Sequence, residues 1–274
     1  MDNPAFKEAS APAFQETRIS PDISSPSRVK TIDGASLAWS NLNIEVTIPD
    51  PDSKKFRKPK IQKSILKNIN GTAHPGQLVA IMGASGAGKT TLLNVLSNQN
   101  MKGLQKSGTV YLNGKEVNNI QDYSAYVQQE DMFYGTMTCR EHLKFQANLR
   151  GVENPDKRVD EVINEMGLQK CADSKIGTPG RGKTISGGEK KRLSVATQIL
   201  AQPSLLFLDE PTSGLDSFLA MQVVKSLQKI SESGTTVLCT IHQPSSEVFA
   251  MFDNLILLAR GRICYSVEIE TPKM

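Results

Sequence analysis

The sequence has few cysteines for its 274 residues, and their arrangement excludes two kinds of cross-link. They stand far apart, with no CxxC spacing and no nearby pair of histidines, so neither a disulfide framework nor a zinc site is expected. Reduced thiols, as in a cytosolic protein, are the expectation. The four are Cys139, Cys171, Cys239 and Cys264.

Long apolar runs are also absent, and no leader is expected. No run approaches the roughly 18 residues that span a bilayer, and the opening MDNPAFKEAS lacks the basic and apolar regions of a signal peptide. The net charge of +4, from 32 basic and 28 acidic residues, is too small to indicate nucleic acid as a partner. The hydrophobic content of 38% is ample, so a folded globular protein is expected.

Composition divides the chain into tails and one domain. The first 35 residues are rich in Pro, Ser, Ala and charge, which predicts a flexible N-terminal tail. The ordered domain is predicted over residues 36–263 and begins with the partly alternating strand SLAWSNLNIEVTI. Residues 264–274 are expected to form a divergent C-terminal tail.

A proline-punctuated stretch, PDPDSKKFRKPKIQK, follows the first predicted strand and is crowded with positive charge. This composition is typical of a solvated hairpin loop, and a contact with an anionic lipid or a phosphate is the alternative. Its basic residues are Lys54, Lys55, Arg57, Lys58, Lys60 and Lys63.

Short apolar runs alternate with helical patterns through the rest of the chain. QLVAIMG, SLLFLDE, TTVLCTIH and NLILLA are typical of buried strands, and GTVYLNG predicts a hairpin turn at Asn113-Gly114. SFLAMQVVKSLQKISESG predicts a helix that stops at Gly234. Residues from about 130 to 182 are predicted to be a helical insertion. Buried strands alternating with helices predict an α/β fold with a parallel sheet covered on both faces.

One glycine-rich loop, GASGAGKTT, fits the phosphate-loop pattern G-x-x-x-x-G-K-[ST] between the strand LVAIM and an apolar helix. Its backbone N–H groups and the helix N-terminus are expected to hold phosphate oxygens. Lys89 is expected to reach the β- and γ-phosphates, and Thr90 to offer its hydroxyl to Mg²⁺. A phosphate loop alone leaves GTPases, kinases and ATPases open. The predicted nucleotide-binding residues are Gly83, Ala84, Ser85, Gly86, Ala87, Gly88, Lys89, Thr90 and Thr91.

An acidic pair follows the apolar run in SLLFLDEP. Asp209, at the end of this strand, is expected to hold Mg²⁺ directly or through water. Glu210 is expected to polarise the attacking water as a general base. Without other motifs, the same pair would be typical of solvated surface.

A second glycine-rich helix start, ISGGEKKRLSVATQIL, lies upstream of the acidic pair. Ser186 and the amides of Gly187 and Gly188 form another anion-binding helix N-terminus or, as the alternative, a plain helix cap. The stretch resembles the signature of ABC-type ATPases, with Glu189 where that superfamily commonly has Gln. The resemblance implies a P-loop NTPase fold of the ABC type, with an antiparallel β subdomain, a parallel-sheet core and the helical insertion. It further implies a head-to-tail dimer, in which residues 186–189 of one subunit cap the nucleotide on the other.

Three more motifs fall in the order of the ABC superfamily. Gln129 in YVQQED resembles the Q-loop glutamine that contacts the metal and the attacking water, with Gln128 as the alternative. SGLD, at residues 213–216, resembles the D-loop that crosses the dimer interface, and His242 resembles the switch histidine that contacts the γ-phosphate. The implied catalytic residues are Glu210, His242, Gln129 and Lys89, and the implied Mg²⁺ ligands are Thr90, Gln129 and Asp209.

Phrases such as DEPTSGLDS and IHQPSSEVFAMFD resemble the G subfamily of ABC transporters, the eye-pigment white and sterol-exporter type, over about residues 36–263. Members are half-transporters that place the ATPase domain before six membrane helices and work as homo- or heterodimers. The resemblance implies ATP and Mg²⁺ as cofactors, a second half-transporter subunit as partner, and export of a lipid or small molecule. It places the domain on the cytoplasmic face of a membrane through a transmembrane domain supplied in trans or by a longer isoform; the chain alone is expected to be cytosolic.

The adenine contact is less directly indicated. Many ABC domains stack adenine on an aromatic residue upstream of the phosphate loop, and Trp39 and Phe56 are candidates. In the G subfamily aliphatic residues take this role, so Val46 and Ile65 are the predicted contacts.

After LLARGRIC the family continues into a membrane domain, whereas this chain runs YSVEIETPKM. A non-transporting isoform that binds ATP and regulates full-length partners is therefore an alternative function. A soluble ABC ATPase of DNA repair or translation is disfavoured, because neither a long coiled coil nor tandem ATPase domains are present. The transported substrate cannot be predicted, because substrate contacts belong to the membrane helices.

Overall fold

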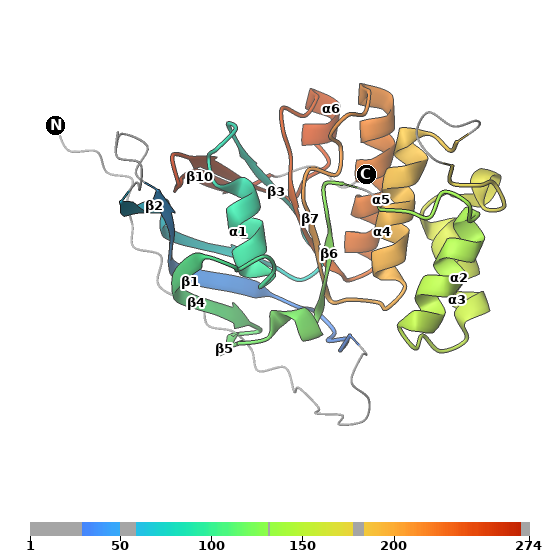
Figure 1. Ribbon diagram of the computed structural model, residues 1–274, viewed down its shortest axis with the longest axis horizontal. Helices are drawn as coiled ribbons and strands as arrows, with labels where there is room; N and C mark the ends of the chain where they lie inside the picture. The colour runs from blue at the N-terminus through green and yellow to red at the C-terminus, as the bar shows by residue number, and fades with distance from the viewer. Residues whose placement is uncertain (1–28, 50–58, 131, 178–183, 270–274) are drawn as a thin grey trace.

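The structure, a computed structural model, describes residues 29–49, 59–130, 132–177 and 184–269 (Figure 1). The predicted N-terminal tail up to residue 28 lies outside the described residues. So do Phe56 and four of the basic residues beside it, Lys54, Lys55, Arg57 and Lys58.

The smaller sheet is antiparallel and consists of β1 (Leu37–Pro49), β2 (Lys60–Ala73), β4 (Leu104–Leu112) and β5 (Lys115–Glu116). Its strand order is β2-β1-β4-β5. The predicted hairpin joins β4 to β5 through Asn113 and Gly114, whose φ angles of 48° and 74° suit a type I′ turn. Lys60 and Lys63, expected in a loop, are strand residues, because pairing of β2 with β1 extends through Val46 and Lys63 to the ends of both strands.

The larger sheet consists of β3 (Leu78–Gly83), β6 (Ser124–Val127), β7 (Leu205–Leu208), β8 (Thr236–Thr240), β9 (Asn254–Ala259) and β10 (Arg262–Glu268). Its order is β10-β9-β3-β8-β7-β6, and every pair is parallel except β9 with β10. β6 and β10 were not predicted, since β6 is short and β10 is largely exposed. The expected boundary at residue 264 falls inside β10, whose pairing with β9 continues to Glu268.

Four helices belong to the main body: α1 (Lys89–Leu96), α4 (Gly187–Ile199), α5 (Ser217–Glu232) and α6 (Ser246–Phe249). The predicted helical insertion contains α2 (Cys139–Leu149), α3 (Pro155–Glu165) and the 3₁₀ turn η2 (Gln169–Cys171). In Figure 1, α2 and α3 lie side by side beyond α4, at the end of the molecule away from the antiparallel sheet. A further 3₁₀ turn, η1 (Ile120–Asp122), precedes β6.

The parallel strands are buried on both faces, so their residues alternate between two cores. Leu206 and Leu208 of β7 join the core beneath the helices α2 to α5, whereas Leu205 and Phe207 join the core formed with α1 and the antiparallel sheet. This explains why the strands read as continuous apolar runs. The predicted α/β fold with an antiparallel subdomain and a helical insertion is confirmed.

Of the helices in the part of the chain that the structure describes, none combines the length and apolar character that crossing a bilayer requires.

Candidate functional site

A cavity of about 1050 Å³ lies between the phosphate loop, the ends of β7 and β8, and the strands β1 and β2. This position, beyond the carboxyl ends of the strands, is typical of ligand sites in parallel α/β sheets. The predicted phosphate-loop residues that line it are Ser85, Gly86, Gly88, Lys89, Thr90 and Thr91, whereas Gly83, Ala84 and Ala87 do not.

The phosphate loop presents the start of α1 to this cavity without a side-chain cap. Gly88 occupies the N-cap position with φ 105° and, because glycine has no side chain, supplies no cap to the helix. A Cβ at Gly88 would lie 2.7 Å from Leu66 Cδ2, so both the backbone angle and the close approach require glycine. The first N–H groups of α1 therefore have no side-chain partner and are suited to hold an anion.

Lys89 lies at the base of this loop and is only 6% exposed. Its Nζ donates to the carbonyl oxygens of Gly83 at 3.0 Å and Ala84 at 3.3 Å. An ammonium group has three donors, and no carboxylate of the described residues lies within ion-pair distance of this one. A buried ammonium group that has no carboxylate partner is stabilised by a bound anion.

The acidic residue at the end of β7 is part of a hydrogen-bonded cluster. Asp209 is 6% exposed, and its Oδ1 accepts from Thr90 Oγ1 at 3.1 Å and from Thr240 Oγ1 at 2.7 Å. Thr240 also accepts the Glu210 backbone N–H at 2.7 Å, so it connects the two acidic residues. Thr240 was not predicted as a site residue, and its one signal in the sequence was its position at the end of the buried strand TTVLCTIH.

Glu210 follows β7 and lines the cavity. Its φ of 45° lies in the left-handed region, which is uncommon for a residue other than glycine and occurs preferentially at functional sites. Gln129 Nε2 donates to Glu210 Oε2 at 3.0 Å, and Lys191 Nζ donates to the Gln129 carbonyl oxygen. Gln129 does not line the cavity itself and adjoins it through its bond to Glu210, whereas Gln128 lines smaller cavities elsewhere.

Two further predicted motifs reach the same cavity. His242, two residues beyond β8, is exposed and lines it. Ser213, Gly214 and Leu215 of the predicted D-loop also line it, while the Asp216 side chain caps α5 by accepting the Leu219 N–H at 2.9 Å.

The segment of residues 186–189, here called the signature segment, does not line this cavity. It starts α4 with a capping box. Glu189 N donates to Ser186 Oγ at 3.3 Å, and Ser186 N donates to Glu189 Oε2 at 2.7 Å. Within one chain, the predicted contacts Ser186, Gly187, Gly188 and Glu189 are therefore not brought together with the phosphate loop.

The predicted adenine contacts Val46 and Ile65 both line the cavity. Trp39 does not, because it is 2% exposed within the core beside α1. Lys63, one of the basic residues for which a phosphate or lipid contact was the alternative, also lines the cavity. Arg260 and Gly261 line it too and were not predicted; their signal was the turn sequence ARGR. Gly261 connects the phosphate loop to β2. Its N–H donates to Ala87 O at 3.1 Å, and its carbonyl oxygen accepts the Lys67 N–H at 2.8 Å.

Comparison with known proteins gives a consistent result. The family described as "ABC transporter" matches residues 66–213. The chain is 48% identical over 246 residues to the "ABC transporter ATP-binding protein/permease wht-1" of Caenorhabditis elegans, covering 85% of this chain and 37% of the relative. It is 44% identical over 268 residues to "Protein white" of Drosophila melanogaster, covering 89% of this chain and 39% of the relative. The chain thus spans less than half the length of these relatives.

A solved structure has the same fold. It is titled as a dimeric, post-hydrolysis state of the ATP-binding cassette MJ0796 bound to ADP and Pi. The similarity has a TM-score of 0.65 at 22% sequence identity, and it covers 86% of this chain and 99% of the other.

Proposed function

Because the chain belongs to the ABC transporter family, we propose that it binds and hydrolyses ATP as the nucleotide-binding domain of a G-type half-transporter. The observation that carries this proposal is the single cavity lined by Lys89, Glu210 and His242. The phosphate-loop pattern alone is shared by several classes of enzyme. An acidic residue and a histidine facing the same loop are what hydrolysis requires in addition.

The phosphate groups of ATP belong at the start of α1 in this proposal. The uncapped N–H groups there and the Lys89 ammonium, which donates to the carbonyl oxygens of Gly83 and Ala84, supply positive charge on the same side of the cavity. Val46 and Ile65, which line the same cavity, offer aliphatic surface to the adenine ring. Lys63 lies on the same strand as Ile65 and adds a cation to that wall.

The donor set beside the phosphate loop suits Mg²⁺, which prefers oxygen ligands. The hydroxyl of Thr90 and the carboxylate of Asp209 already touch, and the side-chain oxygen of Gln129 is the third proposed ligand. When bound, the ion supplies charge neutralisation on the phosphate oxygens.

Glu210 is the proposed general base. Its carboxylate accepts a hydrogen bond from Gln129, which limits the orientations of the carboxylate at the cavity wall. The Thr240 hydroxyl holds its backbone N–H and thereby supports the left-handed backbone conformation. In this arrangement Glu210 takes a proton from the attacking water, and His242 contacts the γ-phosphate.

A second subunit completes the site in this proposal. The signature segment lies outside the cavity of its own chain, so it is available to cap a nucleotide held by another chain. The partner is another half-transporter subunit, identical or different. Through a transmembrane domain, such a dimer couples ATP turnover to export of a lipid or small molecule at the cytoplasmic face of a membrane.

The test replaces Glu210 by Gln in the purified chain. We expect phosphate release to fall by about 100-fold or more, in line with the contribution of a general base, while a fluorescent ATP analogue still binds. In analytical ultracentrifugation, ATP should convert this variant from monomer to dimer. Glu247→Gln, at an exposed acidic residue outside the cavity, is the matched control and should retain wild-type turnover.

Two results would contradict the proposal. Turnover that survives Glu210→Gln would exclude Glu210 as the base. A wild-type chain that fails to bind the ATP analogue would exclude the function itself.

A further inference from the structure

Two consecutive basic residues of α4 are buried and reach different neighbours. Lys191 is 5% exposed, and Arg192 is 8% exposed. The Arg192 guanidinium donates to Gln222 Oε1 on α5 at 3.1 Å. Lys191 Nζ donates to the backbone carbonyl oxygen of Gln129, in the segment that follows β6. Because a buried charge is costly unless it is hydrogen-bonded, each contact stabilises its side chain and connects α4 to a different part of the fold.

The Lys191 contact supports a stretch of backbone outside the sheet. The pairing of β6 with β7 ends at Val127 and Leu208, and the Asp209 N–H donates to the Val127 carbonyl oxygen at 3.0 Å. Gln129 lies two residues further along the chain and is exposed. An exposed residue beyond the end of a strand has more conformational freedom than a paired one, and ordering it costs entropy. The bond from Lys191 restricts this freedom by fixing the Gln129 carbonyl oxygen.

The side chain of Gln129 connects this backbone contact to the proposed base. Its Nε2 donates to Glu210 Oε2 at 3.0 Å, and the oxygen of the same amide group is a proposed ligand of Mg²⁺. The two atoms belong to one planar group, so neither moves without the other. The position of the Gln129 backbone therefore determines how both atoms are presented.

We propose that Lys191 is a positioning residue for ATP hydrolysis: its ammonium group holds the Gln129 backbone so that the Gln129 amide meets the Glu210 carboxylate. Lys191 acts through Gln129 and does not itself touch the substrate. The inference rests on the proposed function of Glu210 as the base.

The position of Lys191 on α4 also connects the two ATP sites of the proposed dimer. Ser186, which caps the partner's nucleotide in that proposal, is the N-cap of the same helix. It precedes Lys191 by five residues, which corresponds to about 7.5 Å along the helix axis. A shift of α4 at the partner's nucleotide is thus passed through Lys191 to Gln129 and Glu210 of its own chain.

The experiment measures ATP turnover by the full chain with Lys191→Met, which keeps a long unbranched side chain and removes the ammonium group. We expect kcat to fall about ten- to 100-fold, as for the loss of a hydrogen bond to a charged group. KM and the affinity of the monomer for the fluorescent ATP analogue should stay unchanged. Lys225→Met, at an exposed lysine of α5, is the control and should keep wild-type kcat.

A double-mutant cycle with Gln129→Ala separates positioning from stability. Gln129→Ala keeps the backbone carbonyl group and removes the amide, so Lys191 then has no side chain to position. In this background Lys191→Met should change kcat by less than about twofold. Arg192→Met removes the neighbouring buried cation and is the matched control, because its effect on kcat should be the same with and without Gln129→Ala.

A second pair of variants covers the case in which Lys191→Met does not fold. Lys191→Arg keeps a charged donor, whereas Lys191→Leu is apolar and has none. Lys191→Arg should therefore have the higher kcat at equal affinity for the ATP analogue. The difference between the two variants should disappear in the Gln129→Ala background.

The outcomes separate this inference from the proposed function. A wild-type chain without ATP turnover overturns both. An active wild-type chain with an unchanged kcat in Lys191→Met, or with equal kcat in Lys191→Arg and Lys191→Leu, overturns the inference alone. A loss that is equally large in the Gln129→Ala background also overturns it, because Lys191 would then act on the stability of α4 and not on Gln129.

Discussion

Two helices of this chain, α1 and α4, begin with glycine-rich segments that look alike in sequence and differ in structure. The start of α1 has Gly88 in a left-handed conformation and no side-chain cap, and it borders the large cavity. The start of α4 has a complete capping box between Ser186 and Glu189 and borders a different, smaller cavity through Glu189.

The two helix N-termini differ in how their first N–H groups are satisfied. An α-helix leaves its first N–H groups without intrahelical partners. At α1 these groups are left for a ligand, which the neighbouring Lys89 also attracts. At α4 the chain's own side chains satisfy part of them, so this start is ordered without a ligand and offers a preformed surface. Substitutions at the two starts should therefore have different consequences.

The largest effect is expected at α1. Lys89→Ala removes the buried ammonium group, and the affinity for a fluorescent ATP analogue should fall about 100-fold or more, as when one partner of a desolvated charge pair is lost. Turnover should fall below detection. Lys115→Ala, on an exposed residue of β5, is the matched control and should bind like the wild type. Equal affinities of the two variants would show that phosphates do not bind at α1.

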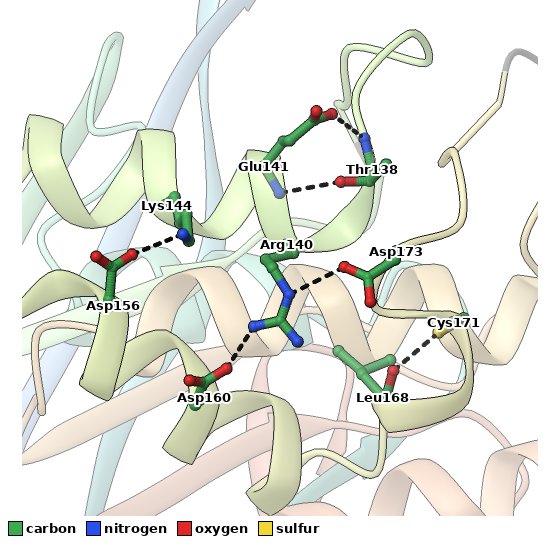
Figure 2. Close-up of polar contacts among 9 residues, drawn as sticks. All are labelled: Thr138, Arg140, Glu141, Lys144, Asp156, Asp160, Leu168, Cys171 and Asp173. Carbon is green, nitrogen blue, oxygen red and sulfur yellow. Dashed lines mark hydrogen bonds and ion pairs between the residues drawn. The ribbon is translucent and has the colours of Figure 1, made fainter.

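An intermediate effect is expected at α4, where the chain supplies its own control. Thr138 begins α2 with the same capping box as Ser186, since Glu141 N donates to Thr138 Oγ1 at 3.1 Å and Thr138 N donates to Glu141 Oε2 at 2.8 Å (Figure 2). Ser186→Ala and Thr138→Ala should each lower the free energy of unfolding by about 1 kcal/mol.

Only Ser186→Ala should also lower kcat, by about tenfold, while monomer affinity for ATP stays unchanged. This is expected because Ser186 has a proposed role at a partner's nucleotide and Thr138 has none. Urea unfolding and phosphate release on both variants provide the measurements. An equal loss of turnover in the two variants would reduce the role of Ser186 to that of a helix cap.

The smallest effect concerns the packing of α4 against the insertion. His142 of α2 is 3% exposed, and its Nε2 lies 3.2 Å from Thr197 Oγ1 on α4. The Thr197 hydroxyl donates to Leu193 O at 2.9 Å, so it accepts from the histidine, whose Nε2 therefore carries a proton. Burial, together with the charge of Arg150, lowers the pKa of His142 below 6.5.

Below about pH 6.5 the unfolded chain therefore binds more protons at His142 than the folded chain does, and stability falls as the pH decreases. His142→Gln should reduce the difference between the free energies of unfolding at pH 7.5 and pH 5. His74→Gln, at a half-buried residue whose ring lies 3.9 Å from Glu268, is the control. A pH dependence unchanged by His142→Gln would exclude this contribution.

Much of the fold and of the candidate site could be predicted from local patterns. The sequence predicts β3, α1, β7 and α5, because buried strands and amphipathic helices show their periodicity in consecutive residues. The sequence does not predict β6 and β10. They are the two edge strands of the larger sheet, and neither has a continuous apolar run. Their place was decided by pairing with β7 and β9.

The sequence by itself determined the chemical inventory of the site: a phosphate loop, an acidic pair after a strand, and a capped second helix start. Each of these motifs consists of a few adjacent residues. Only the tertiary structure decided which groups meet. Thr90 bonds Asp209 across 119 residues, and Gln129 rather than Gln128 reaches Glu210 across 81. Such contacts depend on how strands and helices pack, and no local periodicity encodes that.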